Sequence, residues 1–75
     1  MKPNSPSQQV AANVRAELGR HRRTQTAVGQ HLGLSQTAVS RRLTGAIPFD
    51  VNELHLLATW LDVPVGTLLG EGVAA

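Results

Sequence analysis

The stretch 24–45 constrains the fold of this chain more than any other part of the sequence, because it places two short apolar patterns on either side of one glycine. Val28 and Leu32 are four residues apart, and so are Val39 and Leu43. Side chains at this spacing lie on one face of an α-helix, so each pattern predicts a short helix with one apolar stripe. We expect both stripes to point into a shared core.

A tight turn is predicted between the two helices. Gly33 follows the first pattern, and glycine adopts the left-handed conformation that ends a helix without steric cost. Ser35 supplies an oxygen for the free N–H groups of the next helix, which can begin after a connection of about three residues. Gly29 lies beside the apolar stripe, where its missing side chain lets the second helix approach, although glycine inside a helix costs about 1 kcal/mol relative to alanine.

Cap signals along the rest of the chain predict five helices and no strand, so the expected fold class is all-α. Ser5 begins a capping box with proline at the first helical position, and this helix is expected to run to about Arg22. Asp50 begins a second box, with Glu53 as its partner. The residues expected to start the five helices are Ser5, Thr24, Ser35, Asp50 and Pro64.

Taken together, these residues resemble the helix-turn-helix family of phage Cro and CI repressors and their bacterial relatives, also called lambda-repressor-like or XRE domains. The resemblance implies a five-helix bundle in which the helix 36–44 enters a DNA groove. Two positions depart from the family pattern, which usually has an apolar or aromatic residue at the place of Arg42 and a polar one at Leu43. We expect Leu18 and Leu43 to replace the usual polar pair by apolar contact. The resemblance covers roughly residues 10–69 and is carried by Gly29, the turn 33–35, the segment 39–41, Gly45 and the run 54–58.

The outward side of the helix 36–44 supplies the expected base contacts, since the apolar stripe turns the other side inward. Gln36 projects from the N-terminal end, where its amide can match an adenine edge, and the resemblance implies that this position reads a base. Arg41 can form a fork on guanine, while the hydroxyl residues can contact a thymine methyl or a phosphate. The alternative for the glutamine is an ordinary solvated side chain. The expected DNA base contacts are Gln36, Thr37, Ser40 and Arg41.

A second set of polar and basic residues is expected to contact the DNA backbone. The free N–H groups at the start of the second helix should point at a phosphate, and the resemblance implies that Gln25 binds one. The stem of Arg42 is expected to cover the edge of the core, with its head reaching solvent, Glu17 or a phosphate. The expected backbone contacts are Thr24, Gln25, Thr26, Ser35, Arg42, Thr44, Arg22 and Arg23.

The charges are divided unevenly along the chain. Residues 1–45 hold all seven Lys and Arg against one acid, whereas residues 46–75 hold four acids and neither Lys nor Arg. A basic half that contains the turn motif suits phosphate binding, although the net charge is only +2. The alternative is a solvated arginine face around Arg20, Arg22 and Arg23.

Length and composition argue against several classes of function. A chain of 75 residues forms one small domain with limited room for an active site, and we find no paired acids, activated nucleophile or phosphate loop. We therefore expect no enzyme activity and no small-molecule substrate.

No cysteine is present and the three histidines lack ligand spacing, so neither a metal nor another cofactor is expected. No apolar run approaches the ~20 residues of a membrane span, which predicts a cytoplasmic protein without membrane contact. We expect residues 1–5 to be a flexible N-terminus, 6–70 the DNA-binding domain and 71–75 a C-terminal tail.

Leu56 and Trp60 form a second apolar stripe beside the core-facing one of the same helix. Exposed apolar area of this kind often marks a partner surface, so we expect a homodimer on DNA. The alternative is that Trp60 packs under the tail against Val73. The expected dimer-interface residues are Leu56, Trp60, Leu69 and Val73.

These observations predict a sequence-specific regulator of transcription that binds double-stranded DNA, most simply a phage or bacterial repressor that occupies an operator through the helix 36–44. The alternative function is a protein-interaction module, such as an antitoxin or a partner-binding helical domain. Tight, salt-insensitive binding to a protein without affinity for duplex DNA would favour that alternative.

Overall fold

The computed structural model describes residues 5–70, which form five α-helices and no strand. The predicted all-α class is therefore confirmed over this range. The expectations for residues 1–4, for the tail 71–75 and for Val73 lie outside the described residues. In chain order the helices are α1 (Pro6–Arg20), α2 (Gln25–Leu32), α3 (Gln36–Thr44), α4 (Val51–Leu61) and α5 (Val65–Leu69).

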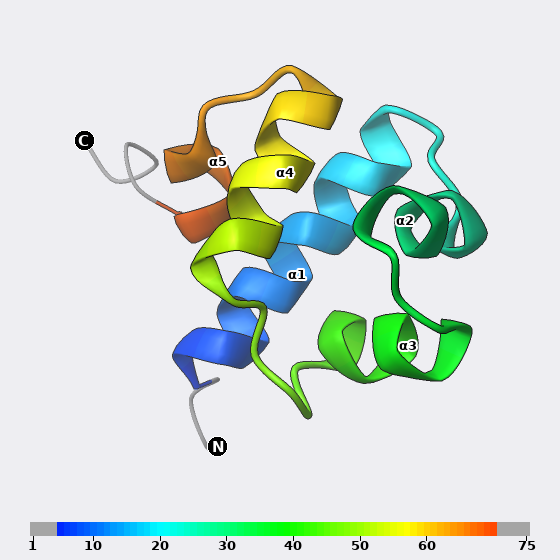
Figure 1. Cartoon of the computed structure of the whole chain (residues 1–75). Coiled ribbons are helices and arrows are strands. Elements are labelled where there is room, and N and C mark those ends of the chain that lie inside the picture. Colours follow the sequence, from blue (N-terminus) through cyan, green and yellow to red (C-terminus); the bar gives the residue numbers. More distant parts are fainter. Residues whose placement is uncertain (1–4, 71–75) are drawn as a thin grey trace.

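The long first helix is the centre of the arrangement. Figure 1 shows α1 crossing the middle of the molecule behind α4, with α2 and α3 on one side and α5 on the other. α1 packs against α3 and α5, while α2 packs against α3 and α4. The second and third helices are thus held as a unit at one side of the molecule.

Side-chain caps start the first four helices where the sequence predicted them. At each start a hydroxyl or carboxylate oxygen accepts a hydrogen bond of 2.7–3.2 Å from the backbone N–H three residues later. α1 ends at Arg20, two residues before the expected end, because the chain turns at once and Arg22 takes a left-handed conformation with φ of 56°. The capping residues are Ser5, Thr24, Ser35 and Asp50.

The turn between α2 and α3 has the predicted geometry. Gly33 ends α2 with φ of 70°, a left-handed conformation in which a side chain is strained. A Cβ on Gly29 would lie 2.9 Å from the carbonyl oxygen of Leu34 and 3.4 Å from a methyl of Val39. The absent side chain of Gly29 therefore allows the close approach of α3, as predicted.

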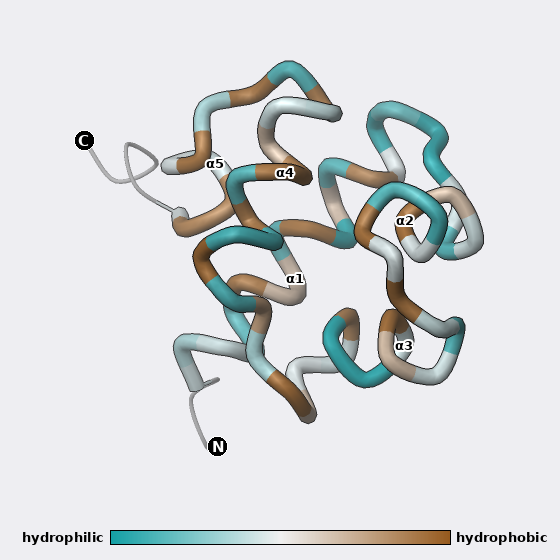
Figure 2. The backbone as a smooth tube through the Cα atoms, in the orientation of Figure 1, coloured by the Kyte–Doolittle hydropathy of each residue, from teal (hydrophilic) through white to brown (hydrophobic). Residues whose placement is uncertain are grey.

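All five helices contribute to a single hydrophobic core. Leu18 and Leu43 both belong to it, with exposed fractions of 5% and 3%, in agreement with the expectation of apolar residues at both positions. Figure 2 shows hydrophobic residues alternating with hydrophilic ones along the helices, as expected of helices with one buried face. The largest fully buried side chains are Leu57, Leu61, Leu68, Val14, Val28 and Val39.

Candidate nucleic-acid interface

The outer flank of α3 is open to solvent. We use this name for Gln36, Thr37, Ser40 and Arg41, which are all exposed. Within residues 5–70 none of these four side chains makes a hydrogen bond or ion pair. On the opposite side of the same helix Val39 is fully buried. The helix is thus anchored by one face while the other presents polar groups without intramolecular partners.

The first turns of α2 and α3 meet around a hollow of about 290 Å³. Gln25 and Gln36, which start the two helices, both line it, as does Thr26. Gln30 lines the same hollow and was missed by the sequence analysis, although its spacing of four residues from Thr26 indicates a shared helix face. The fold therefore brings a predicted base contact and two predicted phosphate contacts to one place on the surface.

Thr24, Ser35 and Thr44 are exposed, as a contact with the DNA backbone requires. The hydroxyls of Thr24 and Ser35 accept hydrogen bonds from the N–H groups of Ala27 and Ala38. Thr44 donates its hydroxyl to the carbonyl of its own helix at Arg41, 3.0 Å away. These hydroxyls therefore also stabilise the ends of α2 and α3.

The partners of the Arg42 side chain differ from those expected. Its Nε donates a hydrogen bond of 3.0 Å to Oε1 of Glu53, and its Nη1 donates to the carbonyl of Ala38 at 3.2 Å. Its side chain is only 18% exposed. The head of Arg42 was expected to reach solvent, Glu17 or a phosphate. The start of α4 brings Glu53 beside α3 instead, and Glu17 binds Arg20. We do not include Arg42 among the proposed DNA contacts.

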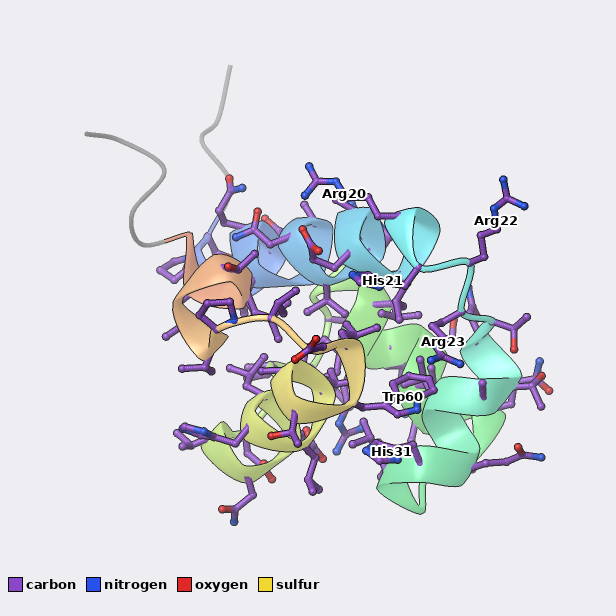
Figure 3. The ribbon with its side chains drawn as sticks, turned by 90° about the horizontal axis from the view of Figure 1, so that it is seen from above. Arg20, His21, Arg22, Arg23, His31 and Trp60 are labelled. Atoms are coloured by element: carbon purple, nitrogen blue, oxygen red, sulfur yellow. The ribbon has the colours of Figure 1, made fainter. Side chains whose placement is uncertain are left out.

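The arginines of the basic cluster at the end of α1 are all exposed but point in different directions. Figure 3 shows Arg20 and Arg22 projecting away from the body of the domain, whereas Arg23 folds back over Trp60. Arg20 is paired with the buried Glu17 at 2.5 Å, although its own side chain is 70% exposed. Of the two arginines in this cluster predicted to contact phosphate, Arg22 is therefore the one that points outward.

Trp60 was expected either to belong to an exposed partner surface or to pack under the tail against Val73. Its ring is stacked on His31, with ring centres 4.8 Å apart, and the guanidinium carbon of Arg23 lies 4.9 Å from the ring centre. Figure 3 shows Trp60 between these two side chains. Leu56 and Leu69 do remain exposed, by 48% and 41%. The apolar surface predicted for a partner is therefore smaller than the sequence suggested.

Arg15 is a structural residue that the sequence analysis missed. It lies on α1 and donates from Nη1 to the carbonyl of Leu43 near the end of α3. A cation at this place stabilises the free carbonyls at a helix C-terminus. No local signal could have shown this contact, since the two residues are 28 positions apart.

Residues 5–70 contain no group of three His, Asp or Glu side chains arranged to hold a metal ion. None of the helices in this part of the chain is both long and apolar enough to cross a membrane.

Two short helices joined at a left-handed glycine, with the second presenting a polar outer flank, define a helix-turn-helix domain. The family model of the BetR domain matches residues 5–74, and the chain belongs to this family. The BetR domain is a small helical domain assigned to the helix-turn-helix type of DNA-binding domains of transcription regulators. The match includes every residue predicted to contact DNA. A comparison with curated proteins finds no match.

Proposed function

We propose that this chain binds double-stranded DNA in a sequence-specific manner and acts as a repressor of the Cro and CI kind. It occupies an operator through α3 and blocks transcription without catalysis. The observation that carries the proposal is the outer flank of α3, whose side chains are exposed, polar and free of partners among the described residues. An α-helix of this kind fits the major groove, where each base pair presents a distinct pattern of donors and acceptors.

The outer flank supplies the base contacts in this proposal. Gln36 pairs its amide with adenine, Arg41 forks onto guanine, and Thr37 and Ser40 contact a thymine methyl or a nearby phosphate. Arg41 has no partner in the described part of the chain, so its guanidinium can turn to a base without breaking an ion pair.

A second group of residues sets the position on the duplex. Gln25 and Thr26 lie beside the hollow shared with Gln36, where a phosphate can accept hydrogen bonds from side chains and from the first N–H groups of α2. Arg22 adds a positive charge in the turn between α1 and α2. The proposed backbone contacts are Thr24, Gln25, Thr26, Ser35, Thr44, Arg22 and Arg23, the last if its side chain leaves Trp60.

We further propose that two copies bind one operator. Leu56 and Leu69 supply exposed apolar area for the contact between them. A two-fold dimer reads an inverted repeat whose half-sites are about 34 Å apart, one helical turn of DNA. The mass of the complex on a duplex with one or two half-sites tests this part separately.

The central experiment compares two arginine variants on two duplexes. The matched duplex is selected from a random pool by the wild-type protein, and the scrambled duplex has the same composition. Arg41→Ala should lose preference for the matched duplex by ~1 to 3 kcal/mol, because a fork to guanine discriminates between bases. Arg22→Ala should weaken binding to both duplexes equally and reduce the slope of log affinity against log salt by about 0.9. Equal losses on both duplexes for Arg41→Ala would refute its assignment to a base.

A protein-interaction module is the second candidate, and the exposed apolar side chains favour it. Val51 is 69% exposed at the start of α4, and Leu56 and Leu69 are also open. If the chain is a protein-interaction module, the wild-type protein shows no affinity for any duplex at low salt. It binds a protein partner with little dependence on salt, and Leu56→Ser weakens that complex.

A further inference from the structure

We infer that Glu53 is a positioning residue that sets the angle at which the outer flank of α3 meets DNA. This inference rests on the proposed function and adds a residue to it that makes no DNA contact. One oxygen of the Glu53 carboxylate serves both the cap of α4 and the guanidinium of Arg42, so it joins the recognition helix to the next helix.

The capping box first fixes the carboxylate. Oε1 of Glu53 accepts a hydrogen bond of 3.0 Å from the N–H of Asp50, and the N–H of Glu53 donates to Oδ1 of Asp50 at 2.7 Å. These reciprocal bonds hold the glutamate side chain against the first turn of its own helix. Its acceptor oxygen is therefore in place independently of α3.

The arginine is fixed in the same way from the other side. Nη1 of Arg42 donates to the carbonyl of Ala38, one turn back on α3, and Nε donates to Oε1 of Glu53 at 3.0 Å. The two side chains are 18% and 13% exposed. A pair this well shielded from water is screened less than a surface pair, and removal of one partner leaves the other charge without compensation.

The orientation of α3 relative to α4 depends on the ion pair between Arg42 and Glu53, because little else connects the two helices. The recognition helix packs on α1 and α2, with much less direct helix-to-helix contact to α4. It is nine residues long, and both of its neighbouring turns pass through left-handed glycines, Gly33 and Gly45. On the α4 side, the ion pair is the polar connection that resists rotation of α3 about its axis.

A small rotation of α3 would misplace the base contacts. Arg41 and Arg42 are consecutive residues of α3, so a rotation of the helix about its axis moves both of them. Side-chain atoms lie about 5 to 6 Å from a helix axis, so a rotation of ~10° shifts them by roughly 1 Å. A hydrogen-bonded fork to a base edge tolerates little displacement of this size.

The test measures the ratio of affinities for the matched and the scrambled duplex, at a temperature where every variant is folded by circular dichroism. Glu53→Ala should reduce this ratio by about 5- to 20-fold. Glu53→Gln keeps an acceptor oxygen for both donors and should retain more of the ratio than Glu53→Ala. Asp50→Ala is the matched control, because it weakens the same helix cap but leaves Glu53 and Arg42 able to pair.

Arg42→Met and the double variant Arg42→Met with Glu53→Ala complete the cycle. If the two residues act as one joint, each single change lowers the ratio by a similar factor and the double change lowers it little further. A ratio that is unchanged in Glu53→Ala, or that falls equally in Asp50→Ala, would overturn the positioning role while leaving the proposed function intact. A wild-type protein that prefers no duplex would overturn both.

Discussion

Two corners of this molecule share one backbone geometry but carry opposite charges. Arg22 leads from α1 to α2 with φ of 56°, and Asp62 leads from α4 to α5 with φ of 58°. At both corners the N–H of the following residue donates a 2.9 Å hydrogen bond to the carbonyl five residues earlier, that of Leu18 or Ala58. Each is a Schellman motif, which closes the helix in the same way.

The two corners differ in how well each side chain tolerates the left-handed conformation. Aspartate tolerates the left-handed conformation better than most residues, whereas arginine has no such advantage, and glycine avoids the strain altogether. The residues that follow also differ, since Arg23 covers Trp60 while Val63 packs against the core. The backbone at the first corner therefore does not require arginine, which supports a role for the positive charge at the surface.

The largest expected effect on stability tests the contact between Trp60 and Arg23, the residue that follows the first corner. Trp60→Ala should lower the free energy of unfolding by about 2 to 3 kcal/mol, since it removes a partly buried aromatic ring together with its stacking on His31 and Arg23. Leu56→Ala is the control on the same helix and should cost at most about 0.5 kcal/mol, because Leu56 is half exposed. Urea unfolding followed by circular dichroism measures both. Similar small losses would show that the stack does not secure the corner.

A smaller effect of opposite sign is expected at Arg22. Arg22→Gly should raise the free energy of unfolding by about 1 kcal/mol, because glycine adopts the left-handed conformation without strain. The same change should weaken DNA binding and lower the salt slope by about 0.9. A variant that gains stability and keeps full affinity would remove Arg22 from the proposed phosphate contacts.

The smallest effect is expected at the second corner. Asp62→Gly should raise the free energy of unfolding by only a few tenths of a kcal/mol, since aspartate is already tolerated there. Duplex affinity should not fall, because an acidic side chain does not bind phosphate. Thermal unfolding and the duplex titration used for Arg22→Gly provide the measurements. A loss of affinity as large as that of Arg22→Gly would place the second corner at the DNA as well.

The helices and the turn could be read from the sequence because their signals are local. A cap acts over three residues, and Gly33 ends a helix through its own backbone conformation, so the starts of α1 to α4 and the left-handed turn agree with the predictions. The inward direction of Val39 follows from helical periodicity. The exposure of the outer flank of α3 follows from the same periodicity.

The partners of the charged and aromatic side chains could not be read in the same way. The head of Arg42 was expected to reach solvent, Glu17 or a phosphate, but it lies on Glu53. Trp60 was expected either on a partner surface or under the tail against Val73, but it is stacked on His31. In each case several residues of suitable chemistry were available. Only the packing of the helices shows which of them is near enough.

By itself, the sequence determined where the first four helices begin and which of their faces are apolar, because these properties depend on interactions within one or two turns. Tertiary structure alone decided that Arg42 is bound to Glu53, and that Gln25 and Gln36 share one hollow. The physical reason is that hydrogen bonds and stacking act over a few ångströms, and folding determines which distant residues come within that range.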